Sequence, residues 1–312
     1  MSITPSFKLL LSEKFGTRVL FDCPLKPYMA YEIGGPSDVL IFPSTEEELE
    51  WLAGEAKRTN TPLQIVGTGT NLLVHDEGIR GITLMLKNGM DSIEVVQSDA
   101  ESVLVRCGGG VLKEKLLSWA CQEGYSGLEF SSGVPGTIGG GIFMNAGTKY
   151  GSYGDILTDL KVFQFDSGIT HLKIADLHFG YRTQDAFRNA VVICATFRLK
   201  RGNSEMISQE ISRIISERKE KQPLDYPSCG STFKNPPGYS AGRLIEKSGI
   251  KGLRIGGAEI SERHANFILN KENATAADVM ALIELIQRIV RERFEIELEP
   301  EVILIGGSSY EK

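Results

Sequence analysis

The 312-residue sequence has few of the residues that build disulfide frameworks and metal sites. Its five cysteines are odd in number and form no C-x-x-C pair, and its four histidines form no H-E-x-x-H motif. The cysteines are Cys23, Cys107, Cys121, Cys194 and Cys229. Such a pattern is typical of reduced thiols in a cytoplasmic protein. We therefore expect cytoplasmic localisation and no bound metal, with Cys107 and Cys194 as small core residues.

Long hydrophobic runs and an excess of positive charge are also missing. No stretch of about 18 apolar residues occurs, so no helix is expected to span a membrane. The first residues lack a charged segment followed by an apolar one, and we expect no signal peptide. The 34 basic and 40 acidic residues give a net charge of −6, which argues against a protein that coats nucleic acid. We expect a monomer that binds small molecules, with neither nucleic acid nor membrane as a partner.

Glycine is the one residue type in clear excess. The sequence has 34 glycines, about 11% of the chain against a usual ~7%, and they are clustered. The remaining composition is that of an ordinary globular protein, with 41% hydrophobic and 24% charged residues. At roughly 150 residues per domain, the length suggests about two domains. We find no tandem repeat that would indicate a solenoid.

Strand and helix patterns alternate along the first two thirds of the chain. Residues 37–42 have the pattern of a strand, and the next helix begins near Thr45, whose spacing to Glu48 predicts a capping box. A strand at 63–66 then runs directly into Gly67, which makes a β-α-β unit that delivers a glycine-rich loop. Further strands are expected at 82–87, 92–96, 102–107, 160–165 and 190–199, and a further helix at 111–123.

The character of the sequence changes after residue 202. A helix is predicted at 205–220, and we interpret its charged end, residues 213–221, as a solvated face on a connector between lobes. The clearest helix spans 275–293, where apolar residues recur at helical spacing. A last strand is predicted at 296–305, in which Glu299 and Glu301 would face the same side.

Two glycine-rich loops, about 65 residues apart, carry the strongest functional signal. The first has Leu72 where a G-x-G-x-x-G fingerprint requires glycine, and no P-loop sequence occurs. Glycines allow consecutive backbone N–H groups to converge on an anion, so two such loops could hold a long diphosphate cofactor at two points. The first loop is Gly67, Thr68, Gly69, Thr70, Asn71 and Leu72, and the second contains Gly133, Val134, Pro135, Gly136, Thr137, Gly139 and Gly140, followed by Asn145 and Gly147.

Both loops resemble those of the FAD domain of the vanillyl-alcohol-oxidase type. The particular version is similar to the UDP-N-acetylenolpyruvoylglucosamine reductase family, in the shorter form that lacks an inserted tyrosine-bearing loop. The motifs that carry this resemblance occur in the family's order, from about residue 25 to 306. They are residues 66–73, 133–140, 145–147, 179–182, 230–236, 256–261, 264–267 and 298–302.

The resemblance implies an α+β fold, with a two-lobed FAD-binding domain and a smaller α+β substrate-binding domain. We expect the FAD lobes at 1–88 and 89–202 and the substrate domain at 203–312, with the last strand, about 296–306, returning to the flavin site. The implied enzyme is a UDP-N-acetylmuramate dehydrogenase of peptidoglycan synthesis, hence of cell-wall biogenesis, cell shape and cell division. It would use non-covalent FAD, with NADPH as hydride donor, to reduce UDP-N-acetyl-3-O-(1-carboxyvinyl)glucosamine through an enolate.

The resemblance also selects three catalytic residues. Arg182 is a permanent cation whose planar fork matches a carboxylate, which suits the charge that develops on the substrate. Glu301 would donate to the enolate, because a carboxyl in an apolar site has a raised pKa. Ser231 would supply the proton. Cys229, two positions away, is the alternative acid, although only Ser231 stands at the family's position.

Four further residues are expected to contact the substrate. Lys234 and Asn235 follow Ser231 and are assigned to the UDP phosphates and the sugar, since lysine is a natural partner for diphosphate. Tyr181 and His264 are further contacts, and His264 could equally be a histidine satisfied within the core.

Two other functions stay open from the residues alone. The first is an alcohol or sugar oxidase of the same FAD superfamily, which would tether its flavin through histidine or cysteine. His75 is the histidine nearest to either loop and matches no tether position. The second is a non-catalytic module that binds nucleotide sugars, against which Arg182, Ser231 and Glu301 argue.

Overall fold

The computed structural model describes residues 3–86, 89–184, 187 and 189–307, and its mixed helices and strands confirm the predicted α+β class. The helices are α1 (Pro5–Phe15), α2 (Glu46–Thr59), α3 (Lys113–Gln122), α4 (Ile138–Phe143), α5 (Ser204–Lys221), α6 (Ala241–Lys247) and α7 (Ala276–Phe294). The strands up to the second glycine loop are β1 (Val19–Pro24), β2 (Pro36–Ile41), β3 (Leu63–Val66), β4 (Leu72–Val74), β5 (Ile79–Met85), β6 (Ile93–Ser98), β7 (Ser102–Gly108) and β8 (Tyr125–Ser126). Those after it are β9 (Gly147–Thr148), β10 (Gly151–Ser152), β11 (Leu157–Gln164), β12 (Gly168–Lys173), β13 (Phe179–Gly180), β14 (Thr183–Gln184), β15 (Ala190–Arg201), β16 (Arg254–Ile255), β17 (Ala258–Ile260), β18 (Ile268–Asn270) and β19 (Ile303–Ile305). None of the described helices is both long and apolar enough to cross a bilayer.

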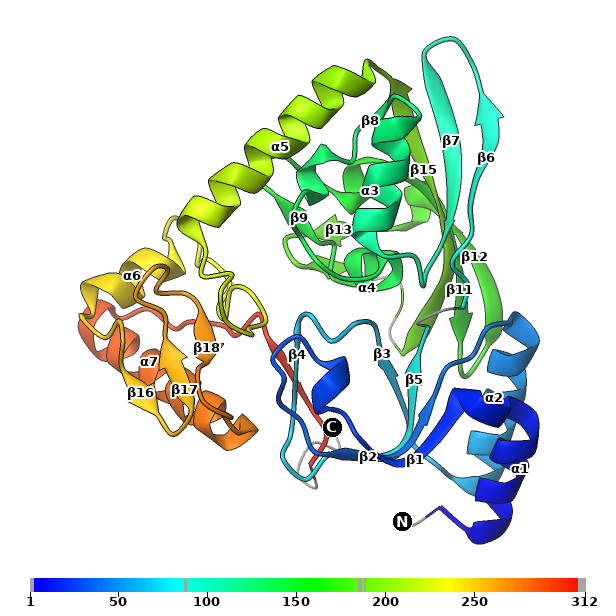
Figure 1. The fold of residues 1–312 in the computed structure, drawn as a ribbon, viewed down its shortest axis with the longest axis horizontal. Coiled ribbons are helices and arrows are strands. Elements are labelled where there is room, and N and C mark those ends of the chain that lie inside the picture. Colours follow the sequence, from blue (N-terminus) through cyan, green and yellow to red (C-terminus); the bar gives the residue numbers. More distant parts are fainter. Residues whose placement is uncertain (1–2, 87–88, 185–186, 188, 308–312) are drawn as a thin grey trace.

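The first sheet has the strand order β1-β2-β5-β3 and is covered by α1 and α2 (Figure 1). β5 pairs in parallel with both β2 and β3, as a β-α-β unit requires. Thr45 caps α2 through Glu48 N–H, as predicted, but the Glu48 carboxylate binds Ser44 N–H and Arg18 in place of closing a capping box. β3 ends at Val66, and the first glycine loop therefore starts at the carboxyl edge of this sheet.

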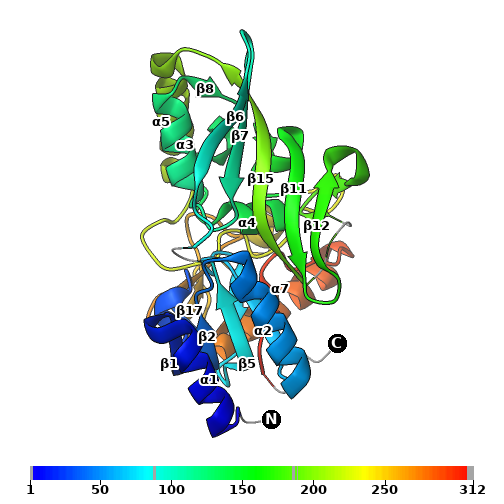
Figure 2. The ribbon, with the colours of Figure 1, turned by 90° about the vertical axis from the view of Figure 1, so that its right-hand side faces the viewer.

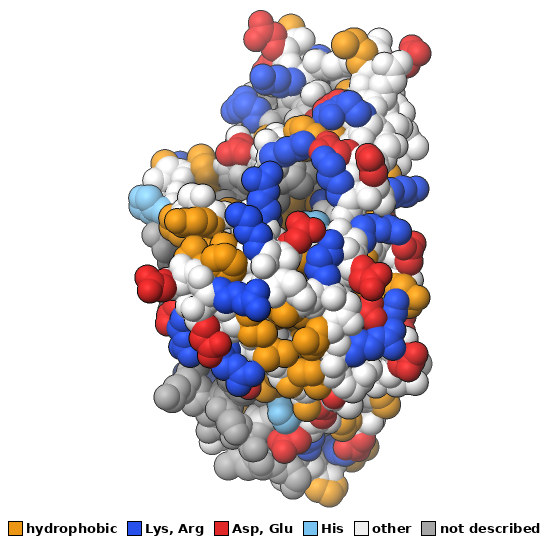
Figure 3. Space-filling model, turned by 90° about the vertical axis from the view of Figure 1, so that its left-hand side faces the viewer, with side chains coloured by type: hydrophobic (Ala, Val, Ile, Leu, Met, Phe, Trp, Pro, Cys, Tyr) orange, Lys and Arg blue, Asp and Glu red, His pale blue; other side chains and the backbone are white. Residues whose placement is uncertain are grey.

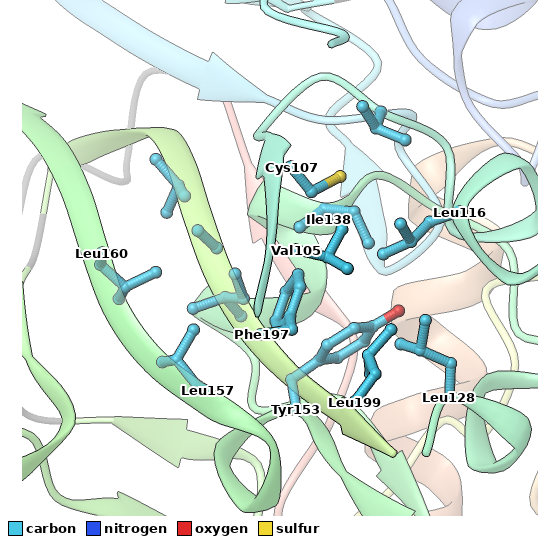
Figure 4. Close-up of a cluster of buried hydrophobic side chains, with 14 of the residues drawn as sticks. Val105, Cys107, Leu116, Leu128, Ile138, Tyr153, Leu157, Leu160, Phe197 and Leu199 are labelled. Carbon is cyan, nitrogen blue, oxygen red and sulfur yellow. The ribbon is translucent and has the colours of Figure 1, made fainter. Parts of the chain in front are cut away.

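The second sheet is antiparallel, in the order β12-β11-β15-β7-β6, with β8 paired to β15. α3 and α4 cover one of its faces, over a cluster that includes Leu116, Ile138 and Phe197 (Figures 2 and 4). Cys107 lies in this cluster, as expected, and burial raises its pKa to about 12, whereas Cys194 is only half-buried. Because Ile138 begins α4 and points into the core, the second glycine loop is anchored to this sheet.

A third, smaller sheet, β16-β17-β18, packs against α6 and α7 (Figure 1). α7 begins with a complete capping box, in which Thr275 caps Asp278 N–H and the Asp278 carboxylate accepts from Thr275 N–H. α5 runs from the second sheet towards this unit, as expected for a connector (Figure 1). Thus three packed units surround the space between the two glycine loops and the end of the chain.

The predicted strand at 296–305 is wrong in its length. Only β19 forms, and it pairs in parallel with β4, directly after the first glycine loop. The residues before it pair instead with residues 232–234, through a bridge between Phe233 and Pro300. The segment therefore pairs first with residues 232–234 and then with β4. As a result, Glu299 and Glu301 do not lie on one strand face: the Glu299 side chain is 69% exposed and that of Glu301 is 12% exposed.

The other predicted elements correspond to observed ones with end shifts of a few residues. Residue 87, at the end of one predicted strand, and residue 88, the first predicted domain boundary, lie outside the described residues. The sequence patterns did not reveal the helices α1, α4 and α6, the third sheet, or the strands β1, β4, β8, β9, β10, β12, β13 and β14. The division into two FAD lobes and a substrate domain stays a prediction.

Candidate active site

A cavity of about 770 Å³ lies where the three units meet. Its walls come from both glycine loops, the start of β15, residues 222–231, and the end of the chain at Glu301, Ile303 and Ile305. Lys and Arg side chains gather around a hollow on one face of the molecule (Figure 3). A cavity of this size suits a cofactor or a drug-sized ligand. No cluster of His, Cys, Asp and Glu that could hold a metal occurs among the described residues.

The two glycine loops meet across this cavity. A Cβ added to Gly67 would lie 3.0 Å from the Thr137 hydroxyl, and one added to Gly136 would lie 3.1 Å from the Thr70 hydroxyl. Gly136 has φ +125°, a conformation that side chains rarely adopt, so this close approach needs glycine. Every predicted cofactor residue except Asn145 lines the cavity.

The residues of the cavity suit a diphosphate cofactor such as FAD. The Thr68 hydroxyl is buried without a hydrogen-bond partner among the described residues, although buried polar groups normally have one. Thr68 belongs to the first glycine loop, which lines the cavity, and a phosphate group bound against this loop would offer its hydroxyl an acceptor. The two loops would hold the cofactor, with Arg182, Lys113 and Arg218 supplying positive charge on the same walls.

Asn145 lies behind the cavity wall. Its amide donates to the Gly180 carbonyl at 2.9 Å and its side-chain oxygen accepts from Gly154 N–H at 3.1 Å. The side chain is therefore used inside the protein, where it ties the second loop to the segment that precedes Arg182. This favours a positioning role over the direct cofactor contact that we predicted.

Arg182 and Glu301 form an ion pair on the cavity wall. The Arg182 Nε donates to Glu301 at 2.5 Å, and its Nη1 donates to the Gly147 carbonyl at 3.1 Å. Arg182 has φ +57° in the tight β13–β14 hairpin, which turns its side chain inward, while the exposed Tyr181 ring lies 5.1 Å from the guanidinium. Two of the five guanidinium N–H donors are thus used, and the others can serve a bound anion.

Glu301 is fixed by its own backbone. Its N–H donates to the Thr232 carbonyl at 2.8 Å, and its carbonyl accepts from the Asn71 amide at 2.9 Å. Burial raises the pKa of the Glu301 carboxyl, and the neighbouring Arg182 partly offsets this effect. The direction agrees with the sequence-based expectation of a carboxyl that keeps its proton more readily than a solvated one.

Ser231 and Cys229 both line the cavity. Gly230 between them has φ +74°, so the segment is not extended and the alternation of side chains along a strand does not apply to Cys229 and Ser231. The Cys229 thiol is buried and donates to the Leu72 carbonyl at 3.2 Å, and burial raises its pKa strongly. Ser231 is only half-buried, and its hydroxyl has no hydrogen-bond partner in the described part of the chain.

The four predicted substrate contacts lie outside the cavity lining. Lys234 pairs with Glu299 at 2.5 Å, and the exposed Asn235 accepts from the backbone N–H at the start of α6. His264 packs its ring 4.9 Å from Phe267, its Nδ1 accepts from a backbone N–H, and burial lowers its pKa. These contacts favour the reading of His264 as a histidine satisfied within the protein.

Two cavity cations were missed by the sequence reading. Arg218 belongs to the charged end of α5 that we interpreted as a solvated face, yet it lines the cavity, and its Nε is buried without a partner among the described residues. Lys113 begins α3 and is 5% exposed. No motif marks either residue; the only available signal for Lys113 was its position at the start of a helix that follows three glycines.

Comparisons with known proteins identify the family of the chain. The family described as "FAD binding domain" matches residues 37–173, and "UDP-N-acetylenolpyruvoylglucosamine reductase, C-terminal domain" matches residues 222–305. The UDP-N-acetylenolpyruvoylglucosamine reductase of Pediococcus pentosaceus is 41% identical over 93% of this chain and 95% of its own length. That of Caldanaerobacter subterraneus subsp. tengcongensis is 41% identical over 91% of this chain and 92% of its own.

A solved structure supports the same assignment. The UDP-N-acetylenolpyruvylglucosamine reductase of Thermus caldophilus has 35% sequence identity and a TM-score of 0.77, and the match covers 92% of this chain and 97% of that one. With this identity and coverage, and with an FAD-binding region that carries both glycine loops, the chain belongs to the UDP-N-acetylenolpyruvoylglucosamine reductase family of FAD-dependent oxidoreductases.

Proposed function

We propose that this protein catalyses the NADPH-dependent reduction of UDP-N-acetyl-3-O-(1-carboxyvinyl)glucosamine to UDP-N-acetylmuramate, in the cytoplasm, for peptidoglycan synthesis. The observation that carries the proposal is the position of Arg182, Glu301 and Ser231 on the walls of one cavity, next to both glycine loops. These residues come from three distant segments, and each has a chemical role in reducing a carboxylate-bearing double bond. Family membership supports the same reaction.

A bound FAD would supply the hydride chemistry between NADPH and the enolpyruvyl double bond. The protein's part is to hold and surround it. The first loop lines the cavity, and its Thr68 hydroxyl is buried without a partner among the described residues, so this loop would hold the diphosphate. None of the described histidines lines the cavity, and its one cysteine, Cys229, is occupied with the Leu72 carbonyl. These features support non-covalent binding.

Arg182 and Glu301 are suited to stabilise the negative charge that develops on the substrate. Arg182 has N–H donors left for the substrate carboxylate, beyond those that bind Glu301 and Gly147. As Arg182 turns to a substrate carboxylate, Glu301 loses part of its countercharge, and burial then favours its protonated form. A protonated Glu301 can donate a hydrogen bond to the enolate, as a preorganised donor must.

Ser231 is the proposed proton donor to the adjacent carbon. It lies one residue before Thr232, whose carbonyl accepts from Glu301 N–H, so the proton donor and the enolate stabiliser are held by adjoining backbone. Its hydroxyl is free of competing hydrogen bonds among the described residues. Cys229 is the poorer candidate, because its thiol is already engaged and its pKa is raised.

The nucleotide part of the substrate needs positive charge as well. Arg218 supplies it on the cavity wall, with a buried Nε that lacks a partner among the described residues. Lys234, Asn235, Tyr181 and His264 stay candidates for outer contacts. Lys234 would have to leave Glu299 to reach a phosphate, and Glu299 is 69% exposed, so that partner can move aside.

The decisive experiment measures anaerobic NADPH oxidation with and without the enolpyruvyl sugar. We expect oxidation only with the sugar, one NADPH per UDP-N-acetylmuramate formed, and loss of turnover in Arg182→Met. Arg80→Met, which removes an exposed arginine that is not part of the cavity lining, serves as the matched control. Acid precipitation should release the yellow flavin. No sugar-dependent oxidation of NADPH, together with flavin that stays in the pellet, would favour a covalent oxidase instead.

A further inference from the structure

Lys113 is a buried cation that the proposed reaction does not use. The residue is 5% exposed, and its Nζ donates to the Pro135 carbonyl of the second glycine loop at 3.2 Å. No carboxylate among the described residues pairs with it. The charged side chains that influence it, Arg182 and Arg218, are both cations. An ammonium group taken out of water without a counterion is costly, so this position demands an explanation.

The position of the ammonium is where the two glycine loops come together. A Cβ on Gly136 would lie 3.2 Å from Lys113 Nζ and 3.1 Å from the hydroxyl of Thr70 in the first loop. Lys113 also lines the cavity. Its ammonium has three donors, and the Pro135 carbonyl uses one of them. The remaining donors are therefore available beside the loops that hold the cofactor.

The other groups around Lys113 leave its charge uncompensated. The Tyr153 ring lies 5.9 Å from Nζ, and burial keeps its hydroxyl neutral by raising the pKa. On α3 itself, Glu114 and Lys115 are exposed. Burial, helped by the two arginines, lowers the pKa of Lys113 to about 8, so the group is still mostly protonated at neutral pH. An anion in the cavity would remove the cost of that charge.

We propose that Lys113 is a built-in counterion for the negative charge of bound FAD, placed in the cavity wall between the two glycine loops. Two parts of the cofactor carry such charge: the diphosphate, which is always anionic, and the isoalloxazine ring, which gains negative charge on reduction. A hydrogen bond to a charged group contributes more than a neutral one. Removing the charge of Lys113 should therefore weaken the cofactor's binding or disfavour its reduction.

The test compares Lys113→Met and Lys113→Gln with the parent protein. Met keeps an unbranched apolar stem, and Gln keeps a donor for the Pro135 carbonyl without the charge. Lys115→Met is the matched control, because Lys115 is on the same helix with a 55% exposed side chain. Three quantities are measured for each holoprotein. The FAD dissociation constant is obtained from flavin fluorescence on dilution. The melting temperature is measured with and without added FAD, and the reduction potential of the flavin is measured as well.

We expect the FAD dissociation constant of both Lys113 variants to rise about 10- to 100-fold if the diphosphate is the partner. If the ring is the partner, the reduction potential should fall while the affinity of oxidised FAD stays unchanged. In either case the melting temperature without added FAD should be unchanged or higher, since a buried charge has been removed. Lys115→Met should match the parent in all three measurements.

Three outcomes would overturn the proposal. Parent-like FAD affinity and potential in both variants would show that the charge is not used. Loss in Lys113→Met with full retention in Lys113→Gln would reduce the role to a hydrogen bond to Pro135. A lower melting temperature without FAD in both variants, with parent-like FAD affinity and reduction potential, would make Lys113 purely structural. Because the parent's own FAD binding is measured in parallel, none of these outcomes would by itself contradict the proposed reaction.

Discussion

Replacement of Ser231 by alanine should separate the two half-reactions of the enzyme. The change removes one half-buried hydroxyl that has no hydrogen-bond partner among the described residues, so the cost to folding should stay within about 0.5 kcal/mol. FAD content should be normal, and NADPH should bleach the flavin at close to the parent rate. In the proposed reaction, only reoxidation by the enolpyruvyl sugar needs the proton assigned to Ser231.

General acid catalysis typically contributes about 100- to 10,000-fold, or roughly 3–5 kcal/mol at 1.36 kcal/mol per decade. We therefore expect reoxidation of Ser231→Ala to slow by that factor in anaerobic stopped-flow absorbance. A larger loss would mean that hydride delivery also depends on the proton. Ser231→Cys should recover part of the rate, because a thiol can donate from the same place.

Cys229→Ala provides the comparison. The Cys229 thiol is 4% exposed and engaged with the Leu72 carbonyl, so its loss should lower the melting temperature by a few degrees without slowing reoxidation. If Ser231→Ala reoxidises at the parent rate and Cys229→Ala does not, the acid has been misassigned and Cys229 is the donor.

The remaining predictions concern cofactor binding, kinetics and pH. Gly136→Val should cost about 1–3 kcal/mol of strain, because φ is +125° and the new Cβ would crowd the Thr70 hydroxyl; the purified variant should contain little FAD, and a fully loaded one would contradict the assignment of this loop. NADPH and the sugar should compete for one cavity, since no second dinucleotide motif occurs, so steady-state lines should be parallel with inhibition at high sugar; intersecting lines would refute this. Burial raises the pKa of Glu301, so the reoxidation rate of the parent should fall as pH rises and the acid form is lost. Glu301→Gln should be slower, and its rate should lack this ionisation. If Glu301→Gln keeps the pH profile of the parent, Glu301 is not the group that titrates. Arg18 lowers the pKa of Glu48 from 4.5 to about 2, so Glu48 should contribute about 2 kcal/mol of stability above pH 4.5, and this contribution is lost as pH falls towards 2. In urea unfolding, Glu48→Gln should therefore lose much of its unfolding free energy relative to the parent at pH 7 and little at pH 3. Equal losses at the two pH values would refute the linkage.

The parts of the site that could be predicted from the sequence are those with local signatures. A glycine at a positive φ, such as Gly136, leaves a mark in the sequence because few other residues fit. Arg182, Ser231 and Glu301 were selected by motifs, and the structure brings all three to one cavity. Their roles stay predictions that the variants above test.

The sequence could not distinguish the charged residues that line the cavity from those on the solvated surface. Arg218 looked like any other member of a solvated helix face, and Lys113 like an ordinary residue of a first helical turn. What distinguishes them is burial against segments far away in the sequence, and no local pattern encodes that. The same reason explains Lys234, which seemed a phosphate ligand from its position after Ser231 but pairs with Glu299 in the structure.

The prediction of one last strand at 296–305 failed for a different reason. Its apolar residues and parity suggested one continuous strand, but Pro300 lacks the N–H that a ladder needs. The chain instead changes partners at Glu301, where the Asn71 amide binds the Glu301 carbonyl. Strand periodicity reports which side a residue faces only while the partner stays the same.

The segment from Glu299 to Ile303 joins the two walls of the cavity. On one side, the Glu299 carbonyl accepts from Lys234 N–H and Glu301 N–H donates to Thr232. On the other side, Asn71 binds Glu301 through its side chain and Ile303 through its backbone. Any hinge motion that parts the third unit from the first glycine loop must break bonds on one of these sides. Amide hydrogen exchange at Glu301 and Ile303 would therefore measure how often the enzyme opens across this line.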